Sequence, residues 1–360
     1  MPNPNAVVST IVRVDREGVE LEGGRRVRLD PANERSAALS RVLEGLSRQG
    51  LHAYLEIDPT TSAITRLLIP LVTRVLRVYP VDEGVLGVEL ELSHARHLLR
   101  RTAPDAEDSE RRLREAVRGL TPVIVTETDA HEIIDVRPRP GGGEGFRPPF
   151  ARPEFPPPAR WPWQWLAEWW RRIRLWKCWP WWWFRCLSAR RAQQVFDAMS
   201  ATSCDPLAVP PPCIPFLYPD DGCWGRAHEM CRLMIAMGLK PKKVWIQGSL
   251  AAPTRNNPSC VVFWGWHVAP TLCVRTRFLS TQTMVIDPSL FATPVTEAQW
   301  KGAQGDPGAT LTPSDASIFY LWGNVTDPTY AQTNTVLATY RLYLQNRSIQ
   351  IGPPPYANCP

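Results

Sequence analysis

The chain has 360 residues and a formal net charge of +6, and 44% of its residues are hydrophobic. Two domains of ordinary size with linkers fit this length, and no apolar run reaches the roughly 18 residues that a transmembrane helix needs. The net charge is −4 over residues 1–136, +8 over residues 137–203 and +2 over residues 204–360, so the basic residues lie mainly in the middle of the chain and nucleic acid is not an expected partner.

Residues 1–136 are predicted to form a separate small α+β domain. Alternating apolar residues predict several strands, residues 64–80 among them, and two amphipathic patterns predict helices at residues 34–50 and 106–120. We expect a barrel-like sheet with a regulatory or delivery role. No metal site is expected, because the spacing of the histidines matches no metal-ligand motif: His52, His94, His97 and His131.

Residues 137–187 are expected to form a Pro/Gly-rich linker followed by a tryptophan- and arginine-rich tract. Residues 161–185 hold ten of the 16 tryptophans, interleaved with basic residues. Such a composition suits the surface of a bilayer, whereas the interspersed charges exclude a spanning helix. Two interpretations stay open for residues 161–186: contact with a membrane surface, or docking against the rest of the chain.

The start of the chain lacks a basic stretch followed by an apolar core, so no secretory signal is predicted. We therefore expect either a cytoplasmic location or export by a signal-independent route. Cys204 and Cys213 bracket a short loop, DPLAVPPP, that a disulfide could close. Five other cysteines show no clear pairing: Cys178, Cys186, Cys260, Cys273 and Cys359.

The sequence DDGCWGRAHEM, residues 220–230, predicts a cysteine at the start of a helix. Asp221 is a suitable N-cap, Gly222 permits a sharp turn, and apolar residues at helical spacing continue from Cys223. A thiol in a first helical turn gains thiolate character from the helix dipole, and the free N–H groups there can bind an oxyanion. The alternative is an inert buried cysteine.

Two later segments supply partners for such a thiol. WGWHVAP places His267 on a predicted strand, and MVIDPSLF places Asp287 at the end of the next one. Adjacent strands can set an imidazole beside a carboxylate, which orients the ring. His228 is a poorer partner, because five helical residues turn it about 140° away from Cys223.

The order and the local sequences of Cys223, His267 and Asp287 resemble the protein-glutaminase (protein-deamidase) family over roughly residues 190–345. These are cysteine amidohydrolases with a transglutaminase-like core. The resemblance implies an α+β fold for residues 188–360, in which a helix bearing the cysteine packs on an antiparallel sheet bearing the histidine and the aspartate.

The resemblance implies that Cys223, His267 and Asp287 are catalytic. The expected reaction hydrolyses glutamine side chains of proteins or peptides to glutamate and ammonia through a cysteine thioester, without metal or organic cofactor. The family also carries an inhibitory N-terminal region. Three tryptophans are expected at the oxyanion site or substrate pocket, although core packing is an equal alternative for them: Trp224, Trp264 and Trp266.

Other functions stay open at this point. The same three residues could serve a transglutaminase, which passes the acyl group to an amine, or a cysteine protease, which cuts the backbone. A non-catalytic protein that binds a membrane or a partner through residues 161–186 is a third alternative.

Overall fold

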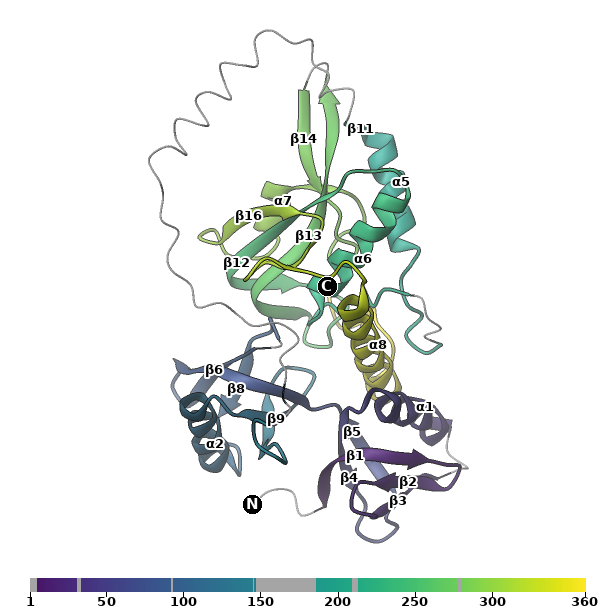
Figure 1. Ribbon diagram of the computed structural model, residues 1–360, viewed down its shortest axis with the longest axis vertical. Helices are drawn as coiled ribbons and strands as arrows, with labels where there is room; N and C mark the ends of the chain where they lie inside the picture. The colour runs from purple at the N-terminus through teal and green to yellow at the C-terminus, as the bar shows by residue number, and fades with distance from the viewer. Residues whose placement is uncertain are drawn as a thin grey trace.

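The computed structural model describes residues 5–30, 34–91, 93–144, 146, 186–208, 213–277 and 280–360. The fold is α+β, as predicted, with helices packed on antiparallel sheets (Figure 1). The tryptophan- and arginine-rich tract lies outside the described residues except for Cys186, so both interpretations of it stay predictions. None of the described helices combines the length and the apolar character needed to cross a membrane.

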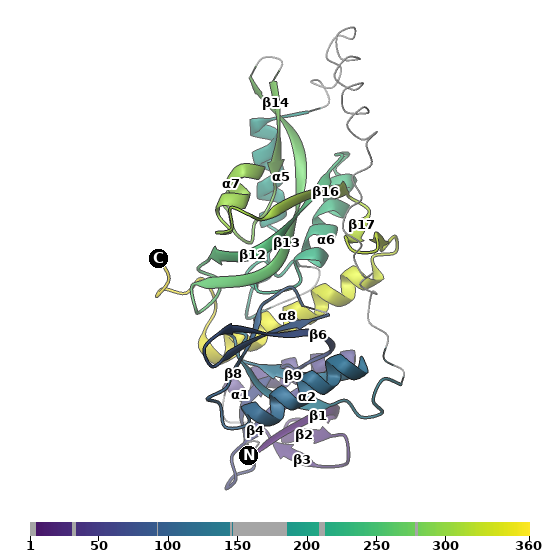
Figure 2. The same cartoon turned by 90° about the vertical axis from the view of Figure 1, so that its left-hand side faces the viewer.

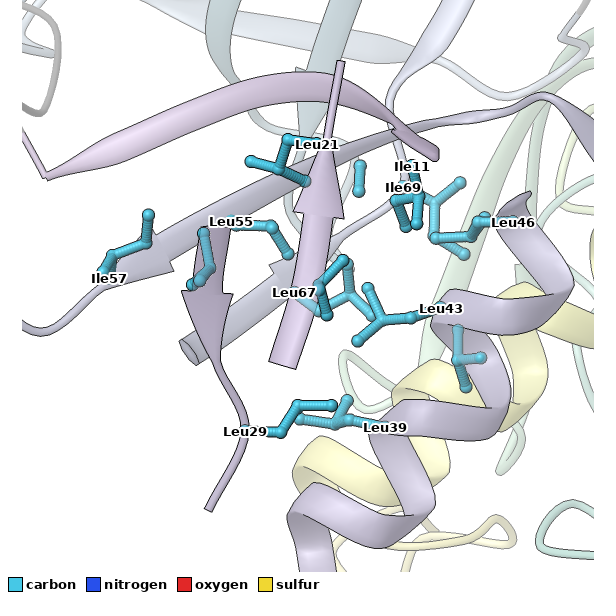
Figure 3. Packing of buried hydrophobic residues seen from close by; sticks show 14 of the residues in the cluster. Ile11, Leu21, Leu29, Leu39, Leu43, Leu46, Leu55, Ile57, Leu67 and Ile69 are labelled. Atoms are coloured by element: carbon cyan, nitrogen blue, oxygen red, sulfur yellow. The ribbon is translucent and has the colours of Figure 1, made fainter. Parts of the chain in front are cut away.

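The first N-terminal sheet has the strand order β3-β2-β1-β4-β5. Its strands are β1 (Ala6–Val14), β2 (Gly18–Leu21), β3 (Arg26–Arg28), β4 (His52–Ile57) and β5 (Ile64–Leu68). The predicted helix at residues 34–50 is α1 (Glu34–Gln49), and it ends before Gly50, whose φ is 63°. One face of α1 packs leucines against the sheet, among them Leu39, Leu43 and Leu46 (Figure 3).

A second N-terminal sheet has the order β10-β9-β6-β7-β8, and α2 (Ala106–Gly119) covers it. Its strands are β6 (Leu71–Asp82), β7 (Val85–Leu90), β8 (His97–Arg100), β9 (Pro122–Glu127) and β10 (Ile133–Pro138). The prediction of a barrel-like sheet is therefore wrong, because the strands form two separate sheets. The strand pattern over residues 64–80 breaks at Ile69–Pro70, because proline has no N–H for a sheet ladder, and its halves enter different sheets.

The C-terminal sheet has the order β15-β14-β13-β12-β16, and β11 (Leu187–Ser188) pairs in parallel with β13. Its antiparallel strands are β12 (Lys242–Pro253), β13 (Val261–Arg277), β14 (Ser280–Val285), β15 (Val295–Thr296) and β16 (Thr310–Asp315). The helices are α5 (Ala189–Ser200), α6 (Cys223–Ala236) and α7 (Glu297–Gly302), and a small hairpin joins β17 (Ile318–Tyr320) to β18 (Val325–Thr326). The predicted histidine, His267, lies on β13, the long strand next to β12 at the centre of the sheet.

The last helix, α8 (Ala331–Ile351), links the two halves of the molecule. It lies between the C-terminal sheet and the N-terminal sheets (Figures 1 and 2). Leu342 is buried in the core of the first N-terminal sheet, whereas Tyr340 and Leu344 are buried with the residues around Cys223. The two cores thus share a helix, and the division into domains at residues 136 and 188 stays a proposal.

Six described cysteines form disulfides: Cys186–Cys273, Cys204–Cys213 and Cys260–Cys359. The second of these is the bridge considered from the sequence. The other two join residues 87 and 99 positions apart, which the sequence could not pair. Among the described cysteines, Cys223 and Cys231 are free and buried, and Cys178 lies outside the described residues.

Candidate active site

Cys223 is the first residue of α6, as predicted, and it is fully buried. Gly222 precedes it with a φ of 78°, a conformation that other residues rarely adopt, and an added Cβ would lie 2.3 Å from the ring of Tyr340. Only glycine therefore fits the turn that starts this helix. The thiol faces β13, where the backbone N–H of Val268 hydrogen-bonds to it.

The expected role of Asp221 as N-cap is wrong. The cap position is Gly222, and no side chain caps the helix. The Asp221 carboxylate instead accepts the N–H of Gly222 at 2.9 Å and the N–H of His94 at 3.4 Å. Arg226 is buried one turn into α6. Its guanidinium donates to the carbonyl oxygens of Tyr218, Pro219 and Asp221, and these bonds fix the loop that precedes Cys223.

His267 and Asp287 lie side by side, with His267 Nε2 2.9 Å from Asp287 Oδ2. His267 stands on β13, and Asp287 follows the end of β14, which pairs antiparallel with β13. The indole N–H of Trp300, on α7, donates to the same carboxylate oxygen at 2.9 Å. Burial opposes charge on Asp287, but His267 and these hydrogen bonds outweigh it and hold the pKa of the carboxyl below its usual value.

A segment from the N-terminal half enters this site. Residues 93–96, here called the occluding segment, pair with β13 as a short antiparallel bridge between Ala95 and Trp264. Gly265 N–H donates to the His94 carbonyl at 2.9 Å, and Arg96 N–H donates to the Phe263 carbonyl at 2.9 Å. The sequence indicated no such role for His94.

The imidazole of His94 lies against the proposed catalytic residues. Its Nδ1 is 3.6 Å from Cys223 Sγ, and its ring stacks 6.1 Å from that of His267. Burial, followed by the neighbouring His267 and Arg226, depresses the pKa of His94 well below its usual value. His94 is therefore neutral at pH 7 and occupies the space in front of the thiol.

The Cys223 thiol is protonated in this arrangement. Burial raises its pKa well above the usual value, and Arg226 and the Val268 N–H only partly oppose that effect. The sequence favoured a thiolate from the helix position alone. The difference arises because burial of the thiol excludes the water that would stabilise the charge.

The three predicted tryptophans surround the site. Trp224 and Trp266 have ring centroids 5.9 and 5.0 Å from that of His94. Trp264 stacks on His267 at 4.4 Å and donates its N–H to the Asp220 carbonyl at 2.9 Å. Their assignment to an oxyanion site or pocket stays a prediction. The position of Trp264 under the imidazole suits orientation of that ring.

His228 lies outside the site, as predicted. Its Nδ1 is 2.8 Å from Lys243 Nζ, and its ring packs against Phe319 and Tyr330. A cavity of about 770 Å³ lies between the two halves of the molecule beside the site, and both His94 and Trp266 line it.

Part of the chain matches a known protein family. Residues 192–304, which include Cys223, His267 and Asp287, match a family of proteins described as glutaminase. This match confirms the resemblance to the protein-glutaminase family and supports an amidohydrolase as the class of the protein. None of the curated proteins compared with the chain is a significant match.

Solved structures of protein-glutaminase and of its pro-form are similar to the chain. A crystal structure of pro-protein-glutaminase has 23% identity and a TM-score of 0.49, and the similarity covers 76% of this chain and 93% of that one. The NMR structure of protein-glutaminase from Chryseobacterium proteolyticum has 27% identity and a TM-score of 0.40, with 49% of this chain and 97% of that one covered.

Proposed function

We propose that this protein is a protein-glutamine glutaminase, which hydrolyses the side-chain amide of glutamine in proteins or peptides to glutamate and ammonia. The observation that supports it most is the His267–Asp287 pair, on β13 and just after β14, inside the residues that match the glutaminase family. Cys223 is the proposed nucleophile, His267 the acid and base, and Asp287 the residue that orients the imidazole.

The reaction follows from these roles. His267 Nδ1 is buried and makes no hydrogen bond within the described residues, so this nitrogen is available to take the thiol proton. The thiolate then attacks the amide carbon, and the imidazolium gives its proton to the departing ammonia, which leaves a thioester. The neutral imidazole next activates water, and hydrolysis of the thioester releases glutamate and restores the thiol.

The N-terminal half is proposed to regulate this activity. The occluding segment places a neutral imidazole against the thiol and pairs with β13, so a glutamine side chain cannot reach Cys223 while it is in place. Three disulfides are typical of proteins that fold in an oxidising compartment, which favours export over a cytoplasmic location.

The test follows ammonia release and peptide masses together, with a denatured glutamine-rich protein and excess primary amine. It uses the full chain, a His94→Gly variant, and protein cut between residues 152 and 153 from which the N-terminal piece has been removed. Glutamines should become glutamates in the last two preparations. Cys223→Ser in the same backgrounds should lower the rate at least about a thousand-fold.

Other products would point to the other functions. Amine adducts or cross-linked dimers in place of glutamate would make the protein a transglutaminase, and cleaved backbones would make it a protease. If no preparation modifies the substrate, the proposal is wrong, and binding of vesicles or partners through residues 161–186 becomes the function to test.

A further inference from the structure

A second group of chemically active side chains lies outside the proposed catalytic residues, where the two halves of the molecule meet. His97 begins β8, Glu127 ends β9, and His131 follows in the turn after β9. All three are buried, and one potential ligand atom from each lies within 4.8 Å of the others. We propose that they bind one divalent cation, for which zinc is the best chemical match.

The arrangement of the ligand atoms supports zinc. The Glu127 carboxylate contacts His131 Nδ1 through one oxygen at 2.9 Å and His97 Nδ1 through the other. Both Nδ1 atoms thus converge on this carboxylate, and the two rings stand nearly perpendicular, at 83°. Two imidazoles and one carboxylate form an established ligand set for zinc, at about 2.0–2.2 Å from the ion. The ion would take the place of the direct contacts that now join the Glu127 carboxylate to the two rings.

The surroundings of the three ligands supply a second, independent observation. His131 Nε2 lies 3.4 Å from the buried carboxylate of Asp220. A histidine that ligates a metal commonly presents its other ring nitrogen to such a carboxylate, which fixes the ring. Asp220 is held in turn by Arg347, at 2.8 Å, and by the Asn257 side chain. An outer shell that would orient His131 is therefore already in place.

The cation also has a route into the site. His131 lines the cavity of about 770 Å³ between the two halves of the molecule, so an ion and the water that would serve as its fourth ligand can arrive from there. Among the described residues, no other group of histidine, cysteine and acidic side chains brings three ligand atoms so close together.

The position of the site gives it a consequence for regulation. His97 lies three residues after His94, and Asp220 lies three residues before Cys223. A bound ion would join β8, β9 and the turn at His131. Because His131 also contacts Asp220, the ion would strengthen the link between the occluding segment and the loop before Cys223. This consequence rests on the proposed function, whereas the metal site itself does not.

The experiment titrates zinc, in competition with a chromophoric chelator, into metal-stripped full-length protein. We expect one equivalent to bind and to raise the melting temperature. His131→Gln and Glu127→Gln should each weaken binding at least about 10-fold. His52→Gln, which changes a histidine on β4 outside the cluster, should bind like the wild type. Cobalt in place of zinc should give the visible bands of a tetrahedral site.

Three outcomes would overturn the proposal. The first is that the metal-stripped wild type binds no zinc. The second is that His131→Gln and Glu127→Gln bind zinc as tightly as the wild type while keeping its near-ultraviolet circular dichroism. The third is a sulfur-to-cobalt charge-transfer band that disappears in Cys223→Ser. The last would place the ion at the thiol with His94. If the cluster variants fail to fold, the cobalt spectrum of the wild type still distinguishes a site without sulfur, at His131 and its neighbours, from a site at Cys223. No readout depends on glutaminase activity, so the two proposals fail separately.

Discussion

Trp300 is not one of the three proposed catalytic residues, but it contacts one of them, Asp287. Its indole N–H donates to the Asp287 oxygen that also contacts His267, and α7 holds its ring fully buried. The capping box at Thr296 and Gln299 fixes the start of that helix. We therefore assign Trp300 as a positioning residue for the proposed reaction.

Trp300→Phe removes this hydrogen bond and keeps a ring in the core. A hydrogen bond to a charged group contributes about 1.5–3 kcal/mol, so kcat of the protein freed of its N-terminal piece should fall about 10- to 100-fold while KM changes little. The pKa of Asp287 should rise, which moves the acidic limb of the pH–rate profile to higher pH. Trp245→Phe, which removes the N–H bonded to Ser314, is the matched control. Equal kcat values for the two variants would contradict the assignment.

His228 should make the folded protein sensitive to acid. Burial and the neighbouring Lys243 lower its pKa to about 4 from the usual value of 6.5. The unfolded chain therefore binds a proton at a higher pH than the folded one, so stability should be lost as the pH falls from about 6.5 towards 4. His228→Gln retains an acceptor for Lys243 and should flatten this dependence.

Urea unfolding at several pH values over that range measures the effect. The free energy of unfolding at pH 7 should differ little between wild type and His228→Gln, and the difference between them should grow towards pH 4. Parallel curves would show that His228 is not the group that titrates.

At the scale of elements, the occluding segment is proposed to control access to the thiol. It adds a short antiparallel partner to the β13 residues Phe263–Gly265, with two backbone hydrogen bonds and one buried imidazole. His94→Gly should keep the backbone pairing and remove the ring, so that water reaches Cys223 and the pKa of the thiol falls towards its usual value.

Alkylation of Cys223 by iodoacetamide, followed by mass spectrometry, measures this change. The His94→Gly variant should react several-fold faster than the wild type at pH 7.5, and His52→Gln should react like the wild type. If His94→Gly reacts no faster, the ring does not control access, and the regulatory role of the segment loses its main support.

At the scale of the whole molecule, α8 makes the two halves interdependent. Leu342 packs against Gly45 of α1, and Arg347 pairs with Asp129 of the N-terminal half and with Asp220 beside the site. The Arg347 side chain is 1% exposed and Asp220 is fully buried, so salt screens their attraction weakly. The occluding segment is thus backed by an extensive apolar and ionic interface.

A single cut between residues 152 and 153 should therefore leave the two pieces associated. We expect them to elute together in gel filtration, also at high salt, and ammonia release to stay low until mild urea separates them. Pieces that separate at physiological salt, or a cut that activates the protein at once, would show that the interface is weaker than its packing indicates.

Local sequence was sufficient for the features that depend on neighbouring residues. Gly222 and the apolar spacing after it predicted the helix that starts at Cys223, and alternating residues predicted the strands that carry His267 and precede Asp287. These features follow from backbone freedom and side-chain periodicity, which a few consecutive residues determine. The α+β class of residues 1–136 follows from the same patterns, whereas that of residues 188–360 was implied by the family resemblance.

The tertiary structure alone decided the contacts between distant residues. It set His94 against Cys223, Trp300 against Asp287 and His97 beside Glu127 and His131, and it divided one expected sheet into two. Spacing along the chain carries no information about these pairs, because each depends on how separate sheets and α8 pack together. Such packing is the summed result of many apolar contacts, and no short motif encodes it.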